Sequence, residues 1–523
     1  MKAKIDENKS FISALSQIAK GSGTVFLGFL CYSTCLLISN IIIARYWGQT
    51  NFGIFSLAFS ILSILAVVSC VGLDRGITRN IAFYQGRKKI DAIPALIINS
   101  VFISLFTSVI AGIGLFALSD YIATTVFRIV SLSIPLKIFA FTLPFFNLIT
   151  IVSSVFRGYH NIKPLVYFQH VSLSVLFAIF LIPLFLIDYA FISVFYAYFT
   201  ATALSLLLLF IYVKTSSKIP SLKSYNFKSS IAKNLLLFSL PLVGTAILQR
   251  IIRWTDTLMI GGLQTAALVG LYNAARPLSL FLTFPLSALL MMYTPVVSSM
   301  YGSNKHNNMR QSYIVITRWL CFLTLPLFLL FFFFPEKLLL FFFGDSYVLA
   351  AVTLQILSIG AVLHNLTGPN GAYLLALGKS KAILYASFAT AVINVSLNFL
   401  LIPRYGIEGA AIASTISIVS VNVIKCVYLY RIHQAHPLDT SMIIPLFLSI
   451  VFSTASILLL NNTIMVSLWI LPIILLLFYV FVFLSLLLSK SVKKEDIQMI
   501  SLIAKKFHLN AAKTTVFLNR YSR

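Results

Sequence analysis

The sequence predicts an all-α polytopic membrane protein with about 14 transmembrane helices, arranged as two parallel six-helix lobes plus two C-terminal helices. Three observations predict this fold class. First, the 523 residues are 59% hydrophobic and 10% charged, with a mean hydropathy of +0.97, which is more apolar surface than a soluble core of this size can bury. Second, apolar stretches long enough to cross a hydrocarbon core of about 30 Å recur from end to end. Third, the chain contains an internal repeat.

Each long apolar stretch predicts one helix, and the loops between the stretches are too short to fold as soluble domains. The expected helices are 21–44, 53–73, 93–118, 131–156, 164–187, 190–213, 232–260, 267–300, 310–334, 346–376, 380–402, 407–431, 441–461 and 464–488. The expected domains are a cytoplasmic amphipathic segment 1–20, an N-terminal six-helix lobe 21–213, a basic cytoplasmic linker 214–231, a C-terminal six-helix lobe 232–431, extra helices 13 and 14 in 441–488, and a basic cytoplasmic tail 489–523.

The repeat relates the two lobes. Leu181-Ile182-Pro183 returns as Leu401-Ile402-Pro403, and the residues that follow stay in register. With an offset of 217, Phe52-Gly53-Ile54-Phe55 returns as Val269-Gly270-Leu271-Tyr272. Duplicated membrane halves are typical of transporters, in which two similar lobes rock about a central site.

The distribution of Lys and Arg orients the helices. Basic residues gather before the first helix, in the even-numbered loops and after residue 489, whereas the odd-numbered loops hold only Arg45, Arg128, Lys337 and Arg404. Cytoplasmic loops are enriched in Lys and Arg. We therefore expect a multi-pass protein of the cell membrane (plasma or inner), with both termini in the cytoplasm. Because six is even, the two lobes have the same orientation, related by an axis along the membrane normal.

The net charge of +26 raises the question of nucleic acid. Basic residues on the cytoplasmic face follow the insertion rule and contact anionic membrane lipid, so we expect no nucleic-acid partner.

Motifs for catalysis are absent from the sequence. It has no Walker loop, no His-Glu-x-x-His and no Gly-x-Ser-x-Gly, which are the patterns of ATP hydrolysis, zinc proteolysis and serine hydrolysis. The five cysteines lie in or near apolar spans without ligand-like spacing. We expect no enzymatic activity, no catalytic residue, no cofactor and no metal.

Charged residues within the spans are few and mostly cationic, and intramembrane charge usually faces a bundle interior or a wet cavity. Arg45, Arg250, Arg253 and Arg276 fall in the outer halves of helices 1, 7 and 8, where they could line one positively charged central cavity. The guanidinium fork binds phosphate oxygens in pairs, so these four arginines are the candidate substrate-binding residues.

Other interpretations of these charges stay open. Asp256 lies three residues after Arg253 on a helix, so the two could form a structural ion pair. Arg45 could equally be an interfacial anchor. A further set of cations, closer to the membrane surfaces, is expected to snorkel: Lys137, Arg318 and Lys425.

Prolines mark the expected moving part. Pro277, Pro285 and Pro295 lie in helix 8, and each removes an intrahelical hydrogen bond. We expect a bend at or next to Pro285 or Pro295, and these three prolines are the candidate hinge.

Three runs of residues resemble a known family. The runs Ala44-Arg45-Tyr46-Trp47-Gly48 to Ala58, Asp256 to Ala275, and Leu401 to Ala411 resemble the polysaccharide (lipid-linked oligosaccharide) flippase branch of the multidrug/oligosaccharidyl-lipid/polysaccharide exporter superfamily. The resemblance implies two six-helix lobes around a central cavity. It also implies flipping of a polyprenyl-diphosphate-linked glycan from the inner to the outer leaflet for cell-surface polysaccharide synthesis.

For such a cargo, the arginines would bind the diphosphate, and Gln249 and Asn273 would contact the sugars. A glycan polymerase or glycosyltransferase complex is a further candidate partner. The alternatives are a flippase for the peptidoglycan-precursor lipid and a multidrug antiporter of the same superfamily. A different class is a non-transporting scaffold of a glycan-synthesis complex, which would need no arginines in a cavity.

Overall fold

The computed structural model describes residues 23–87, 92–159, 161–187, 189–216, 229–437, 439–463 and 470–489. Across these ranges the chain is helical and contains no β-strand, which confirms the predicted all-α class. The predictions for the N-terminal segment 1–20, for residues 217–228 of the linker and for residues 490–523 of the tail lie outside the described residues.

Internal contacts group the described residues into two compact units. We call Thr24–Ala274 together with Asn394–Ala410 the N-terminal unit, and Ala275–Ile393 together with the described residues from Ala411 onward the C-terminal unit. The lobe boundaries expected from the repeat stay a prediction.

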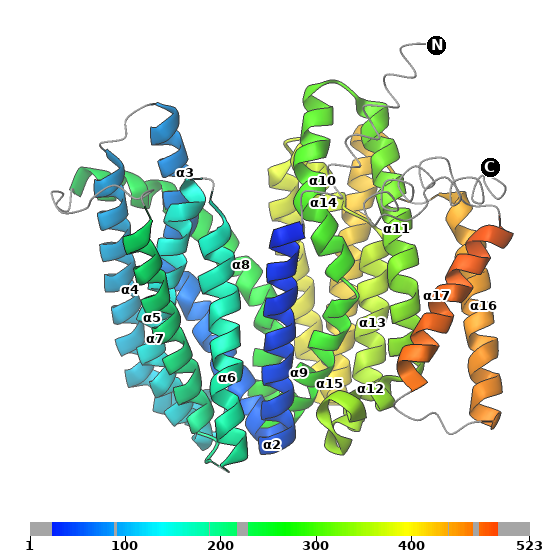
Figure 1. Ribbon diagram of the computed structural model, residues 1–523, viewed down its shortest axis with the longest axis horizontal. Coiled ribbons are helices and arrows are strands. Elements are labelled where there is room, and N and C mark those ends of the chain that lie inside the picture. The colour runs from blue at the N-terminus through cyan, green and yellow to red at the C-terminus, as the bar shows by residue number, and fades with distance from the viewer. Residues whose placement is uncertain are drawn as a thin grey trace. The chain divides into compact units, whose positions relative to one another are not determined.

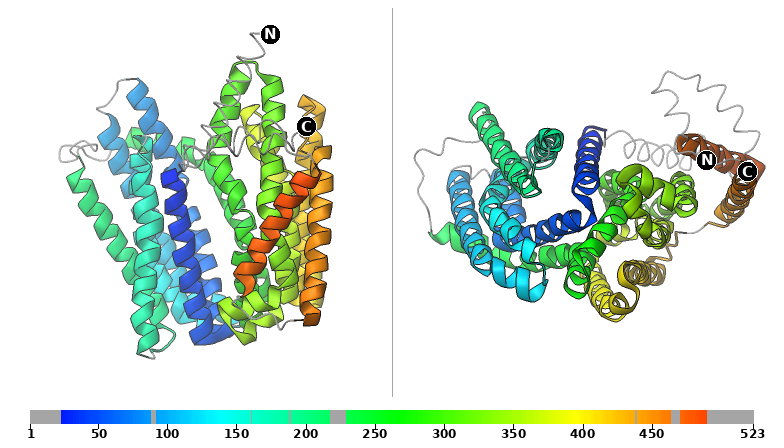
Figure 2. Two further views of the ribbon diagram at one scale, coloured as in Figure 1. Left: turned by 45° about the vertical axis from the view of Figure 1, so that its right-hand side comes forward. Right: turned by 90° about the horizontal axis from the view of Figure 1, so that it is seen from below.

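The N-terminal unit is built from long apolar helices that lie lengthwise beside one another (Figures 1 and 2). Helix α5 packs against α3, α4 and α7, and α6 packs against α7. The helices are α2 (Gly23–Cys70), α3 (Leu73–Gly86), α4 (Ile93–Tyr121), α5 (Ser133–Gly158), α6 (Leu173–Leu186), which continues the π-helix η4 (Leu165–Ser172), α7 (Ser193–Thr215) and α8 (Ser229–Leu263). Helix α9 (Ala266–Phe281) begins in this unit.

The C-terminal unit contains the second half of α9 and most of the remaining helices. Helix α11 packs against α10, α13, α16 and α17. The helices are α10 (Phe284–Gly302), α11 (His306–Phe333), α12 (Pro335–Phe343), α13 (Ala351–Leu366), α14 (Asn370–Ala376), α15 (Ser380–His433), of which residues 394–410 belong to the other unit, α16 (Thr440–Thr463) and α17 (Leu471–Leu488).

Two pairs of expected helices are joined with hardly any loop. In α2 the helical backbone is interrupted at Gly48, with φ 79°, and in α15 at Gly406, with φ 54°. These positions separate the expected helices 1 and 2, and 11 and 12. Glycine adopts positive φ without a Cβ clash, so each chain reversal needs little more than one residue of special conformation.

Two expected spans are divided by short breaks. Span 8 is divided between α9 and α10 at residues 282–283, and Pro285 lies in the first turn of α10. Span 10 is divided between α13 and α14 at Thr367–Pro369, where Gly368 has φ 61°. A Gly-Pro pair stops a helix because glycine permits the turn and proline cannot donate to the previous turn.

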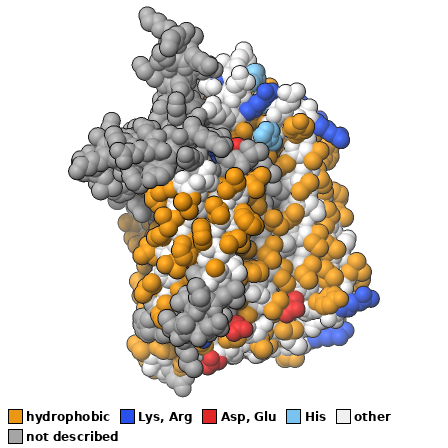
Figure 3. Space-filling view, turned by 90° about the vertical axis from the view of Figure 1, so that its right-hand side faces the viewer, with side chains coloured by type: hydrophobic (Ala, Val, Ile, Leu, Met, Phe, Trp, Pro, Cys, Tyr) orange, Lys and Arg blue, Asp and Glu red, His pale blue; other side chains and the backbone are white. Residues whose placement is uncertain are grey.

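The outer surface is that of a multi-pass membrane protein. Within the described ranges, nine helices are long and apolar enough to cross a membrane, with α2 and α15 each counted once. In Figure 3, hydrophobic side chains cover the middle of one face, and charged side chains gather toward its two ends. On α16 and α17, for example, Phe447 and Leu476 each expose 65% of their surface, which suits lipid contact and not water.

Candidate functional site

Arg250 and Arg253 lie on the same side of α8, because residues three apart in a helix are neighbours. Arg253 is exposed and Arg250 is half-buried. Arg250 is within electrostatic range of Arg253, of Asp74 on α3 and of two tyrosines, Tyr32 and Tyr198. The N-terminal unit therefore holds two guanidinium groups close together, near one carboxyl group and two tyrosines.

Close packing fixes the position of α8 against α3. A Cβ added to Gly72 would lie 2.7 Å from the carbonyl oxygen of Ser239, and one added to Gly76 would lie 2.1 Å from the Ser239 hydroxyl oxygen. Further along α8, the indole Nε1 of Trp254 donates to the hydroxyl of Ser63 at 3.1 Å. Small residues at one end and a hydrogen bond at the other thus hold the helix that carries the arginine pair.

Helix α3 adds a third arginine that sequence reasoning missed. Arg75 Nη2 donates to Gln249 Oε1 at 3.4 Å, next to Arg250 in the chain. Helix α3 is held by Arg157 of α5, which donates to the carbonyl oxygen of Asp74 at 3.0 Å and to the hydroxyl of Thr78 at 3.1 Å. Arg75 falls in one of the basic even-numbered loops, between the expected helices 53–73 and 93–118, and its charge alone predicts a cytoplasmic loop and not this contact.

Asp256 is the centre of a buried polar cluster. The residue is 3% exposed. Its Oδ1 accepts from Asn398 Nδ2 at 2.8 Å and from Asn394 Nδ2 at 3.2 Å, and its Oδ2 accepts from the Tyr272 hydroxyl at 2.5 Å. These neutral donors stabilise a buried carboxylate. The interpretation of Asp256 as the ion-pair partner of Arg253 stays a prediction.

Asn273 lies in the interior of the N-terminal unit. It is 7% exposed, its Nδ2 donates to the Val269 carbonyl oxygen at 2.9 Å, and its Oδ1 accepts from the Thr257 hydroxyl at 3.2 Å. Asn273 therefore joins α9 to α8. Gln249, by contrast, is exposed, so its side chain is accessible to a cargo.

Arg45 lies in the last turn before the interruption of α2 at Gly48 and is exposed. Nearby, Trp47 Nε1 donates to the carbonyl oxygen of Tyr189 at 3.2 Å. This hydrogen bond joins the part of α2 just before Gly48 to the α6–α7 loop. An exposed arginine beside a packed tryptophan fits either of the roles that the sequence left open for Arg45.

Arg276 and Pro277 lie in the part of α9 that belongs to the C-terminal unit. Arg276 is half-buried, and its carbonyl oxygen accepts from the Ser279 hydroxyl at 2.8 Å. Its proposed role, like that of the three prolines, stays a prediction.

The two glycines matched by the repeat pack against each other. A Cβ on Gly53 would lie 1.8 Å from the carbonyl oxygen of Ala266, and a Cβ on Gly270 would lie 2.0 Å from the carbonyl oxygen of Gln49. Gly53 and Gly270 are 217 residues apart, and so are Gln49 and Ala266. This reciprocal contact therefore joins two positions that the sequence repeat matches.

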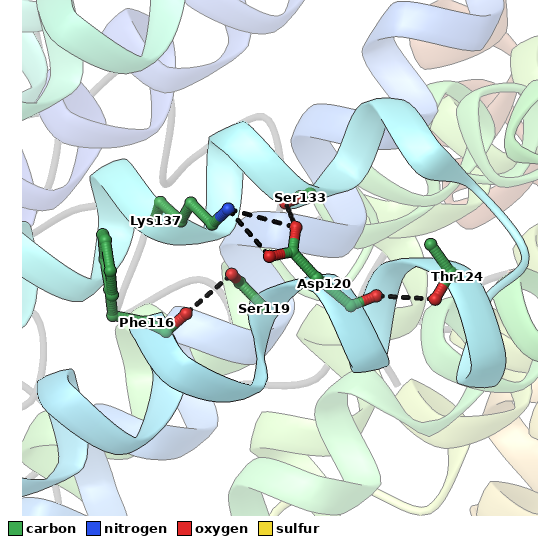
Figure 4. A network of polar contacts seen from close by, with 6 residues as sticks. All are labelled: Phe116, Ser119, Asp120, Thr124, Ser133 and Lys137. Atoms are coloured by element: carbon green, nitrogen blue, oxygen red, sulfur yellow. Dashed lines mark hydrogen bonds and ion pairs between the residues drawn. The ribbon is translucent and has the colours of Figure 1, made fainter.

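Two further cations of the spans have carboxylate partners. Lys137 Nζ lies 2.9 Å from Asp120 Oδ2, and the hydroxyl of Ser133 donates to the same carboxylate (Figure 4). Arg318 Nη1 lies 3.5 Å from Asp439 Oδ2, with the Arg318 side chain 1% exposed. The expectation that Arg318 snorkels is therefore wrong, because the aspartate before α16 brings a counter-charge to it. The described residues contain no group of three or more His, Cys, Asp or Glu that could hold a metal ion.

Comparisons with known proteins agree with this architecture. Residues 19–301 match the family model described as "Polysaccharide biosynthesis protein", and residues 241–400 match the model MatE. The "Teichuronic acid biosynthesis protein TuaB" of Bacillus subtilis is 26% identical over 25% of this chain and 27% of its own length, so the chain spans about a quarter of that relative. A Shigella flexneri protein named "Putative O-antigen transporter" is 22% identical over 77% of this chain and 95% of its own.

Solved structures share the fold. The structure titled "Lipid II flippase MurJ, inward closed conformation" superposes with a TM-score of 0.71 at 16% identity, covering 88% of this chain and 97% of that one. The match to the family model over more than half of the chain confirms the sequence resemblance. The chain belongs to the polysaccharide biosynthesis protein family, in the polysaccharide flippase branch of the multidrug/oligosaccharidyl-lipid/polysaccharide exporter superfamily.

Proposed function

We propose that this protein flips a polyprenyl-diphosphate-linked oligosaccharide from the inner to the outer leaflet of the cell membrane, by alternating access through a cationic cavity. The glycan then serves cell-surface polysaccharide synthesis. In this proposal both termini are cytoplasmic, anionic lipid contacts the basic inner face, and a glycan polymerase or glycosyltransferase complex receives or supplies the cargo.

The observation that carries the proposal is the arginine pair Arg250 and Arg253 on α8, with Arg75 beside Gln249 on the same helix. Three guanidinium groups in one unit of a membrane protein have a high desolvation cost unless they meet water or an anion. A diphosphate offers several oxygens for bidentate binding. The exposed amide of Gln249 is suited to a sugar hydroxyl. Arg45 and Arg276 extend this cationic path in the proposal.

The family relatives support the direction of this proposal. One is named for O-antigen transport and the structural neighbour for flipping lipid II. A flipped lipid needs a polar route for its head while its tail stays in the bilayer.

A binding experiment tests the cationic site. Protein in lipid nanodiscs is titrated with polyprenyl diphosphate, polyprenyl monophosphate and uncharged polyprenol. We expect the diphosphate to bind best and the uncharged lipid worst. In the variant Arg250→Gln/Arg253→Gln, each phosphate contact removed should cost about 1.5 to 3 kcal/mol, so the loss of both should lower the affinity by about a hundredfold or more.

Lys137→Gln is the control, because it neutralises a cation of the same unit, one that is paired with Asp120. It should bind the diphosphate like the wild type. Equal diphosphate affinity in the double variant and the wild type would exclude this site. A wild type that binds none of the three lipids would favour the scaffold alternative.

A further inference from the structure

Helix α3 buries one face and exposes the other. The buried residues lie on the side that packs into the apolar core of the N-terminal unit, and they are Leu73, Gly76, Ile77 and Ile81. On the other side, exposed side chains recur at every fourth position, namely Arg75, Arg79, Phe83 and the C-cap residue Arg87. Residues four apart lie on one side of a helix, so these four side chains form a single line along α3. We call them the α3 stripe.

Two arginines of the α3 stripe share one aromatic ring. The guanidinium carbon of Arg79 lies 5.3 Å from the centre of the Phe83 ring, and that of Arg87 lies 4.5 Å from it. A guanidinium group over an aromatic ring is held by the quadrupole of the ring. Because phenylalanine carries no charge, this arrangement holds two cations near each other without neutralising either. Phe83 therefore assembles a place that attracts an anion.

The α3 stripe keeps a positive charge as a whole. Residues 73–87 contain three arginines and one acidic residue, Asp74. Asp74 is half-buried, and its charge acts on Arg157 of α5 and on Arg250 of α8. The single carboxylate of α3 is thus shared with cations of two other helices and does not balance the three arginines of the stripe.

One end of the α3 stripe meets the arginine pair of α8. Arg75 Nη2 donates to Gln249 Oε1 at 3.4 Å, and Arg250 is the next residue of α8. From Arg75 the stripe follows α3 to Arg87, and at a rise of 1.5 Å per residue it covers about 18 Å. In Figure 1, α3 lies at one end of the N-terminal unit. The stripe therefore leads from an end of the unit to the arginine pair.

We propose that the α3 stripe is the loading site for the cargo, where a lipid-borne diphosphate binds before it reaches the arginine pair. The inference rests on the proposed function and adds the place at which the head of the cargo enters. The diphosphate docks on Arg79 and Arg87, passes Arg75 and arrives at Arg250 and Arg253. Since the loop after α3 is basic and expected in the cytoplasm, docking takes place at the inner leaflet.

The order of these contacts follows from their exposure. Attraction between opposite charges strengthens as water is excluded, and Arg79 and Arg87 are exposed, whereas Arg250 is half-buried. A diphosphate therefore binds weakly on the α3 stripe and more tightly at the arginine pair. A stripe that served only the phospholipids of the bilayer would need no connection to α8, and the hydrogen bond from Arg75 to Gln249 supplies one.

Flipping kinetics test the loading site. The initial flipping rate is measured against the concentration of a fluorescent polyprenyl-diphosphate oligosaccharide, in vesicles of phosphatidylcholine alone, for the wild type and for Arg79→Gln/Arg87→Gln. We expect KM to rise about tenfold in the variant, because a cluster of like charges raises the local concentration of an opposite charge by about that factor or more. We expect kcat to stay unchanged, since Arg250 and Arg253 are intact.

Arg128→Gln/Arg404→Gln is the control for this measurement. It removes the same charge from two exposed arginines of the N-terminal unit, in loops expected on the outer side, and it should keep the wild-type KM.

Three results would overturn the loading site alone, provided that the wild type flips the cargo. They are a wild-type KM in Arg79→Gln/Arg87→Gln, an equal rise of KM in both double variants, and a rise that appears only when phosphatidylglycerol is added to the vesicles. In the last case the stripe would serve anionic phospholipid. A wild type that does not flip the cargo would contradict the proposed function and the loading site together.

Discussion

A single methyl group at Gly270 should disrupt the close contact between α2 and α9 in the N-terminal unit. The Cβ of Gly270→Ala would lie 2.0 Å from the carbonyl oxygen of Gln49. An ordinary contact needs about 3.5 Å, so α2 and α9 must separate by roughly 1.5 Å at this point. The obstacle is main chain, which cannot rotate away as a side chain does.

The cost follows from that geometry. Overpacking where side chains can adjust costs about 1–3 kcal/mol. Because a carbonyl group of a packed helix is in the way, we expect Gly270→Ala to destabilise the protein by about 3 kcal/mol, the upper end of that range. Gly53→Ala should cost at least as much, because its Cβ would lie 1.8 Å from the Ala266 oxygen. The two variants should not add, because either one already separates the pair.

The assay is the thermal unfolding midpoint of purified protein in one detergent, with Gly262→Ala as the control. Gly262 lies on α8 with nothing within 4 Å of an added Cβ, and alanine favours a helix over glycine by about 1 kcal/mol. We expect a clear fall in the midpoint for Gly270→Ala and none for Gly262→Ala. If Gly270→Ala unfolds at the wild-type temperature, the close approach of α2 and α9 is wrong.

Two further predictions concern buried charges. Arg318→Met should destabilise the protein by about 3–5 kcal/mol because it removes the cation that lies 3.5 Å from the Asp439 carboxylate. Arg318→Met/Asp439→Leu should recover most of that loss in the same unfolding assay, and a double variant as unstable as the single one would exclude the pair. Asp256→Leu removes the acceptor of three buried donors, and each donor left without a hydrogen bond should destabilise the protein by about 1–3 kcal/mol. Asp256→Asn keeps one acceptor oxygen, and the Tyr272 hydroxyl can rotate to suit the new amide, so this variant should be more stable than Asp256→Leu. Equal midpoints for the two Asp256 variants would contradict the hydrogen bonds assigned to its carboxylate.

The sequence predicts the helices well because each apolar stretch must satisfy its own backbone in lipid. Most predicted spans coincide with structural helices to within a few residues. The lack of loops at Gly48 and Gly406 could not be predicted, because in each case a single glycine with positive φ takes the place of the loop between two helices. The break in span 10 has a local signal, the Gly368-Pro369 pair, which the length of the apolar run outweighed.

The candidate site was harder to predict because its contacts join distant parts of the chain. Charge alone singled out Arg250 and Arg253 as candidates, and the structure brings Arg75 of α3 beside Gln249. The partners of Asp256 come from α9 and α15, and the partner of Arg318 precedes α16. A helical pattern predicts neighbours three or four residues apart, so it suggested Arg253 for Asp256 and gave Arg318 no partner at all.

The most direct test of the account is flipping itself. Protein is reconstituted into proteoliposomes with a fluorescent polyprenyl-diphosphate oligosaccharide. An enzyme added on the side of the opposite leaflet cleaves the glycan that arrives there, and the cleavage measures flipping. We predict flipping by the wild type and by Lys137→Gln, and a loss of at least about tenfold, the value of one charge-assisted contact, in Arg250→Gln/Arg253→Gln reconstituted at the same density. Wild-type flipping rates in the double arginine variant would contradict the central role of the cationic site.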